Sequence, residues 1–147
     1  MNVAYYTVYP NWRRNQMFDL NSECNVNDVL DRWVALRQFL ARKNTDLNTY
    51  DMYKDLKQID VWLVHDPTPD SFRFLVRNWI SPQKVIFMLS EPPVVNPWGW
   101  KYLKYYSRLF KVFLTWHSEL CRRSTRFLRY HFPVKFNKSK YGHYKSK

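Results

Sequence analysis

The chain has 147 residues, which is enough for one domain with a hydrophobic core and too few for a second full domain. A hydrophobic content of 46% and a charged content of 24% exclude global disorder and a fibrous repeat. The formal charge of +12 and the aromatic content of 19% are high. The surface is therefore expected to attract anions, with phosphate, nucleic acid and anionic lipid all open.

Cysteine spacing and the N-terminal residues bear on the compartment. Cys24 and Cys121 lie far apart, with no CxxC or Cys/His ligand spacing, which predicts neither a zinc site nor a disulfide framework. The first residues lack a basic and then apolar leader, and no uninterrupted apolar stretch approaches the roughly 20 residues of a membrane helix. The sequence thus predicts a cytoplasmic protein with no transmembrane segment and no bound metal.

Strands and helices are predicted in alternation along the chain. Short β-branched or aromatic runs bounded by turn residues predict strands at 3–9, 47–50, 61–65, 84–89 and 112–114. Helical spacing of apolar residues predicts helices at 27–44, 71–80 and 100–110. We expect Asn27 or Asp28 to cap the first helix. The run at 84–89 is apolar at consecutive positions, which is typical of a central strand buried on both faces of a parallel sheet.

This alternation favours an α/β fold with an open, mostly parallel, Rossmann-like sheet. We expect the domain to occupy residues 1–134, and the basic segment 135–147 to be a tail or the start of an interdomain linker. In such a fold, ligands bind outside the carboxyl ends of the strands. The loops that follow the strands, at 10–14, 65–67, 90–93 and 115–117, are therefore the places where a site is expected.

Glu91 is the best single candidate for a catalytic residue. It directly follows the central strand, and Pro92 and Pro93 stiffen the turn that presents it. A carboxylate in this position is suited to act as a general base. The alternative is that Glu91 caps the next segment or pairs with a surface arginine.

Other candidates lie in the neighbouring loops. His65 and Asp66 follow the strand at 61–65 and could contact an acceptor, although a histidine at a strand end is often structural and Asp66 before a proline is a typical turn residue. Trp98 and Trp100, in an aromatic loop, could stack on a sugar ring or close the hydrophobic core. Because the glycines are only Gly99 and Gly142, no Gly-rich phosphate loop is present.

Residues 84–120 resemble the N-terminal domain of glycosyltransferase family 10, the α-1,3/1,4-fucosyltransferases. The likeness is sharpest at MLSEPP, which contains Glu91, and at LFKVFLTW, which ends in Trp116 where the family more often has tyrosine. Upstream, the order of NQMFDL, LRQFLARKNTDLNTYD and IDVWLVHD also fits. The resemblance covers most of residues 1–134.

The resemblance implies one half of a GT-B fold, in which two Rossmann-like domains face each other across a cleft. It implies inverting transfer of fucose from GDP-fucose to a glycan hydroxyl, with Glu91 as base and no strict need for a metal ion or another cofactor. His65, Asp66, Trp98, Trp100 and Trp116 would then shape the acceptor side. The GDP-fucose site would lie mostly outside this chain, on a C-terminal domain or a partner chain.

A second class of function remains open from the composition. The charge of +12 and the many aromatic rings would also suit a basic binding module for nucleic acid or another polyanion, without catalysis. No RRM, KH or OB-type pattern supports this alternative.

Overall fold

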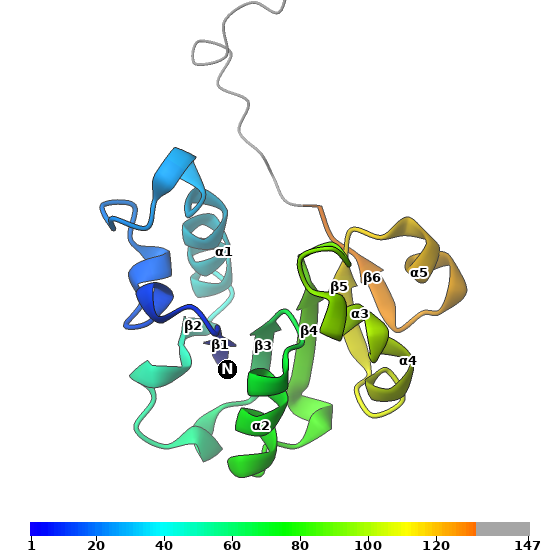
Figure 1. The fold of residues 1–147 in the computed structure, drawn as a ribbon. Coiled ribbons are helices and arrows are strands. Elements are labelled where there is room, and N and C mark those ends of the chain that lie inside the picture. The colour runs from blue at the N-terminus through cyan, green and yellow to red at the C-terminus, as the bar shows by residue number, and fades with distance from the viewer. Residues whose placement is uncertain (132–147) are drawn as a thin grey trace, which may run out of the picture.

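The computed structural model describes residues 1–131, with Asn27 described by its backbone alone (Figure 1). Its centre is a six-stranded sheet in the order β2-β1-β3-β4-β5-β6, and every neighbouring pair is parallel. The strands are β1 Asn2–Tyr6, β2 Asp46–Thr49, β3 Val61–His65, β4 Val85–Leu89, β5 Val112–Thr115 and β6 Phe127–Arg129. The predicted open α/β, Rossmann-like fold is confirmed.

Helices and single 3-10 turns connect the strands. The helices are α1 Asp31–Ala41, α2 Pro69–Arg77, α3 Pro97–Lys101, α4 Leu103–Tyr106 and α5 Ser118–Arg123. The 3-10 turns are η1 Pro10–Trp12, η2 Gln16–Phe18, η3 Val26–Asp28, η4 Tyr50–Met52, η5 Leu56–Gln58 and η6 Pro82–Lys84. Within residues 1–131, no helix has the length and apolar character needed to cross a membrane.

Helices cover both faces of the sheet because the strand order reverses at β1. The chain moves from β1 to β2 in one direction, crosses back over β1 to β3, and continues to β4 in the other direction. Right-handed crossovers therefore place α1, between β1 and β2, and α2, between β3 and β4, on opposite faces. Because helices cover both faces, successive side chains of β1 pack alternately against one face and then the other. Val3 and Tyr5 pack with Trp33 of α1, whereas Ala4 and Tyr6 pack with Leu75 of α2.

The strand predicted to be central is central. β4 pairs with β3 on one side and β5 on the other, and four of its five residues are buried. Phe87 is fully buried and its ring contacts the rings of Phe72, Phe110 and Phe113. Burial on both faces explains why this strand is apolar at consecutive positions rather than at alternate ones.

Two predicted boundaries near the N-terminus are wrong. β1 ends at Tyr6 rather than at Tyr9, because the Thr7 side chain accepts a hydrogen bond from the Tyr9 N–H at 3.1 Å and turns the chain toward η1. α1 begins at Asp31 rather than at 27–28, because Asp28 has a left-handed backbone with φ of 59°.

The predicted aromatic loop at 97–100 is also wrong, because these residues form α3. Pro97 begins the helix, and the Asn96 side chain caps it by accepting a hydrogen bond from the Gly99 N–H at 3.0 Å. The helix predicted over 100–110 is therefore two short helices, α3 and α4, that meet at Tyr102.

Other differences lie at element ends. α2 stops at Arg77, whereas the helix was predicted to run to residue 80. Trp79, inside the predicted range, has φ of 53° and is 94% exposed. α5 and β6, which are short and rich in arginine, were not predicted from the sequence. The predicted domain end at 134 and the basic segment 135–147 lie outside the described residues.

Candidate functional site

A cavity of about 340 Å³ lies at the carboxyl edge of the sheet, where the strand order reverses. In open parallel sheets this switch point is the usual binding crevice, because the loops after the two strands diverge toward opposite faces. The cavity is lined by Tyr9, Trp12, Val29, Arg32, His65, Ser90 and Glu91. Two of the predicted site residues, His65 and Glu91, thus meet there, although the sequence separates them by a helix.

The backbone of Ser90 and Glu91 is held by side chains from three other segments. The Oδ1 atom of Asp66 accepts hydrogen bonds from the N–H of Ser90 at 2.8 Å and from the N–H of Glu91 at 3.1 Å. The indole N–H of Trp116 donates to the Ser90 carbonyl at 3.0 Å. The indole N–H of Trp100 donates to the Glu91 carbonyl at 2.9 Å.

These four hydrogen bonds satisfy every backbone N–H and C=O of the two residues, and we refer to them as the Ser90–Glu91 clamp. They use three residues that the sequence analysis assigned to acceptor binding: Asp66, Trp100 and Trp116. In the structure each of the three contacts the turn that presents Glu91. None of the three lines the cavity beside Glu91.

Asp66 is fixed in a conformation that aspartate tolerates but rarely adopts. Its φ is 51°, and its own N–H donates to the Met88 carbonyl at 2.9 Å. The side chain is buried, with 6% of the residue exposed. Burial raises the pKa of Asp66 to about 6, against the lowering effect of the two hydrogen bonds from Glu91 and Ser90. The carboxylate is therefore ionised only above mildly acidic pH.

His65 lies inside an aromatic cluster rather than at the surface. Its ring stacks on Trp12 at 5.4 Å and lies within about 6 Å of the rings of Tyr5, Tyr9 and Trp33. Burial, with a smaller effect of the Arg32 charge, lowers the pKa of His65 to about 4. The imidazole is thus neutral at neutral pH.

The contact between His65 and Asp66 is consequently not an ion pair at neutral pH. Nε2 of His65 lies 3.2 Å from Oδ2 of Asp66, but Oδ2 has no hydrogen-bond partner among the described residues. Because the contact is not aligned for a hydrogen bond, it does not compensate for burial of the imidazole. Nδ1 of His65 is likewise buried without a partner in this part of the chain.

Glu91 is partly exposed at the cavity, and within residues 1–131 its carboxylate forms no salt bridge. Burial, and after it the charge of Glu91, raises the pKa of Tyr9, which lines the same cavity. Burial lowers the pKa of Arg32 of α1, which lines the same cavity, and the charge of Glu91 is among the effects that raise it. A carboxylate without a salt bridge, on a fixed turn and beside a neutral imidazole, is available to accept a proton.

Trp98 is placed differently from the other predicted residues. Its ring lies 5.3 Å from Phe72 of α2 and stacks on Tyr106 of α4 at 6.5 Å, with an interplanar angle of 8°. It therefore packs on the α2 face and does not line the cavity beside Glu91. Trp98 follows the core-closing alternative of the sequence analysis.

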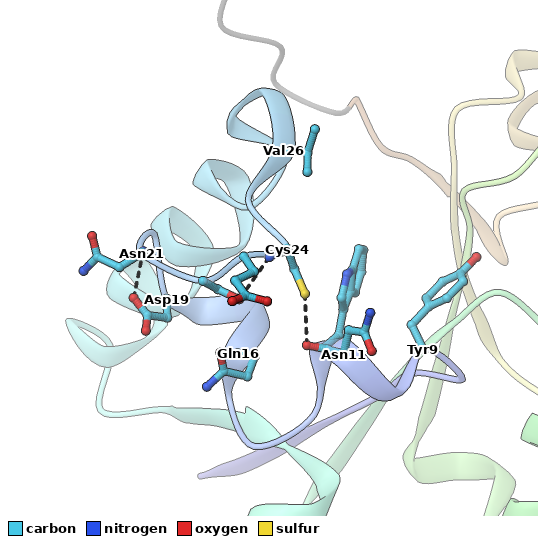
Figure 2. A pocket seen from close by; sticks show the side chains of 10 residues that line it. Tyr9, Asn11, Gln16, Asp19, Asn21, Cys24 and Val26 are labelled. Atoms are coloured by element: carbon cyan, nitrogen blue, oxygen red, sulfur yellow. Dashed lines mark hydrogen bonds between the residues drawn. The ribbon is translucent and has the colours of Figure 1, made fainter.

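A second, larger cavity of about 890 Å³ lies beside the first and shares Tyr9 and Trp12 with it. Its other lining residues come from the turns and loop between β1 and α1: Asn11, Gln16, Asp19, Asn21, Ser22, Glu23, Cys24 and Val26 (Figure 2). Of these residues, only those in the loop at 10–14 were predicted to lie near a site. Because most of the others are polar and follow no helical or strand periodicity, nothing in their spacing distinguishes a cavity wall from an ordinary loop.

Fold and site together define an open parallel α/β domain with paired cavities at its switch point. Within the described residues, no cluster of three or more histidine, cysteine or carboxylate side chains is placed to hold a metal ion. Comparisons with protein-family models, with curated proteins and with solved structures find no match to this chain.

Proposed function

We propose that this chain is the acceptor-binding half of an inverting, fucosyltransferase-like glycosyltransferase, with Glu91 as the general base. The observation that carries the proposal is the Ser90–Glu91 clamp. It presents at the switch-point cavity a carboxylate that forms no salt bridge within residues 1–131. A positioned base of this kind matches the role that the resemblance to family 10 gives to the same residue.

In the proposed reaction, Glu91 takes the proton of an acceptor hydroxyl as that oxygen attacks the anomeric carbon of fucose. The new bond joins the acceptor oxygen to the anomeric carbon. The bond from that carbon to the phosphate oxygen of GDP-fucose breaks, and GDP leaves with the electron pair. In-line attack inverts the configuration at the anomeric carbon, and the proton remains on Glu91 until solvent removes it.

The other predicted residues have two kinds of role in this proposal. Asp66, Trp100 and Trp116 hold the turn, so that the carboxylate stays within reach of the acceptor hydroxyl. Neutral His65, with Tyr9, forms the wall against which the acceptor lies. GDP-fucose would be held mainly by a second domain or a partner chain, so transfer needs both halves.

The test is transfer of fucose by this chain fused to, or mixed with, a GDP-fucose-binding domain. We expect Glu91→Gln to lower kcat by about 10²–10⁴-fold, the usual contribution of a general base. Glu119→Gln is the matched control, because Glu119 is exposed and its only described ion pair is with exposed Arg123 at 3.5 Å. A Glu91→Gln protein as active as its parent would remove the base assignment. A parent with no transfer to any glycan would contradict the proposal itself.

A basic binding module for nucleic acid or another polyanion is the second candidate, favoured by the net charge of +12. This candidate gives no role to a clamped carboxylate. Its test is the salt dependence of binding to single-stranded DNA.

A further inference from the structure

The side chains that line the large cavity beside the Glu91 cavity carry negative charge, which is unusual for this basic protein. The chain carries 24 lysine and arginine residues against 12 acidic ones. Ten residues of the described part of the chain, 1–131, line the cavity; none of these ten is basic, and two of them, Asp19 and Glu23, are acidic. A phosphate or sulfate group would meet these carboxylates there, with no compensating cation from residues 1–131. The cavity therefore disfavours polyanions, although the protein as a whole attracts them.

The remaining walls combine aromatic rings with uncharged polar groups. Trp12 and Tyr9 provide rings 5.4 Å apart, and Asn11, Gln16 and Asn21 provide amides that both donate and accept hydrogen bonds. Aromatic faces with surrounding amides and carboxylates suit a ligand that has apolar ring faces and many hydroxyl groups. An anionic ligand would meet the carboxylates of Asp19 and Glu23, and a purely apolar ligand would leave the amides without hydrogen bonds.

The walls are also held in place by local bonds. The Cys24 thiol donates to the Asn11 carbonyl at 3.3 Å, and the Asn21 N–H donates to Asp19 Oδ1 at 2.9 Å, as the dashed lines of Figure 2 show. Trp12 is fixed by stacking on His65. Contacts within the fold thus position the walls of the cavity.

The two cavities share Tyr9 and Trp12 and are therefore adjacent. The outer cavity, at about 890 Å³, is more than twice the volume of the Glu91 cavity, at about 340 Å³. We infer that the acceptor is a neutral oligosaccharide whose reacting sugar lies beside Glu91 and whose further sugars lie between Trp12 and Glu23. The position of the reacting sugar rests on the proposed function, whereas the ligand class of the outer cavity rests on its own lining.

The test is binding of the full chain to immobilised glycans, without a donor. The probes are neutral glycans of one to six sugars, sulfated glycans and a single-stranded oligonucleotide. We expect neutral glycans of three or more sugars to bind at least tenfold more tightly than single sugars. Glu23→Arg should weaken binding of the longer neutral glycans at least fivefold. Glu119→Arg makes the same charge change at another exposed glutamate, outside both cavities, and should leave binding unchanged.

Three outcomes would overturn the inference: no binding of any neutral glycan, affinity that does not depend on glycan length, or equal effects of the two arginine variants. Thermal unfolding of both variants shows whether either is misfolded. Failure of the proposed function gives a different result. The parent fused to a donor domain would then transfer fucose to no glycan, while length-dependent glycan binding still required Glu23.

Discussion

Asp66 and His65 are buried neighbours whose pKa values move toward each other's usual range. Burial raises the pKa of Asp66 from 3.8 to about 6 and lowers that of His65 from 6.5 to about 4. As pH rises from 4 to 6, the contribution of Asp66 to the free energy of unfolding decreases, because the folded chain holds the proton of Asp66 more tightly than the unfolded chain does. The contribution of His65 increases over nearly the same range, because there the unfolded chain binds the proton of His65 more tightly than the folded chain does. The two contributions largely offset each other.

Replacement of one partner should uncover the contribution of the other. Asp66→Asn keeps a side-chain oxygen that can accept both hydrogen bonds of the clamp but removes the ionisable group. We expect the free energy of unfolding of Asp66→Asn, relative to the parent, to increase between pH 4 and pH 6 by at most about 3 kcal/mol. Urea denaturation at several pH values measures this difference. A constant difference across the range would mean that Asp66 does not titrate as the buried geometry requires.

At the scale of the element, the turn after β4 depends on two indoles that come from α3 and from the end of β5. Trp100→Phe and Trp116→Phe keep an aromatic ring but remove one N–H donor each. Each variant should lose about 1 kcal/mol of stability from the hydrogen bond. In the fused enzyme, kcat should fall while KM changes little, because the turn presenting Glu91 loosens without loss of a cavity wall.

Trp98→Phe is the control for both variants. Trp98 lies in the same helix as Trp100, and its ring packs on Phe72 and Tyr106. Within the described residues its indole N–H makes no hydrogen bond to the clamp. The Trp98→Phe variant should therefore be less stable, because it loses packing contacts, but its kcat should not change. Equal loss of kcat in all three variants would argue for a general effect of aromatic packing instead of positioning.

Gly99 is the second element-scale feature, because a side chain has no room at this point of α3. A Cβ atom there would lie 2.6 Å from Nδ2 of Asn96 and 2.8 Å from the Pro67 carbonyl oxygen. Asn96 cannot move away freely, since it caps α3 and also donates to Pro67 at 3.1 Å.

Gly99→Ala should accordingly destabilise the protein by about 1–3 kcal/mol, as overpacking usually does, despite the higher helix propensity of alanine. Thermal or urea unfolding measures the effect. In an Asn96→Gly background only the contact with the Pro67 backbone remains, so the added methyl group should destabilise the protein less. A stabilising Gly99→Ala change would contradict the close approach of α3 to the loop after β3.

At the scale of the whole molecule, the net charge and the cavities favour different ligands. The charge of +12 predicts weak, sequence-independent binding of single-stranded DNA, whose affinity falls linearly on a logarithmic scale as salt increases. We expect a Kd on the order of 10⁻⁴–10⁻⁶ M at physiological salt. Glu91→Gln and Glu23→Arg should change it little, because this binding does not use the cavities. Tight binding that resists moderate salt would instead favour the polyanion-binding function.

Local pattern predicted much of the architecture. β3, β4 and β5 lie where β-branched and apolar runs predict them, and their alternation with helices was enough to predict a parallel sheet. The errors lie where a single side-chain contact decides the boundary. Thr7 ends β1, and Asn96 starts α3 inside a segment that has the composition of a loop. Such contacts cannot be inferred from periodicity, which averages over several residues.

For the site, local pattern was enough to identify the residues at strand ends, and parallel strands place their carboxyl ends at one edge of the sheet. This selected Glu91 and His65, which the structure brings to one cavity. Long-range packing was needed to show that Asp66, Trp100 and Trp116 hold the turn of Glu91, and that the loop between β1 and α1 forms a second cavity. Three of the four hydrogen bonds of the clamp join residues 24 to 26 positions apart, and a non-periodic loop lines the second cavity. Both features depend on the packing of the whole sheet, which local sequence pattern does not describe.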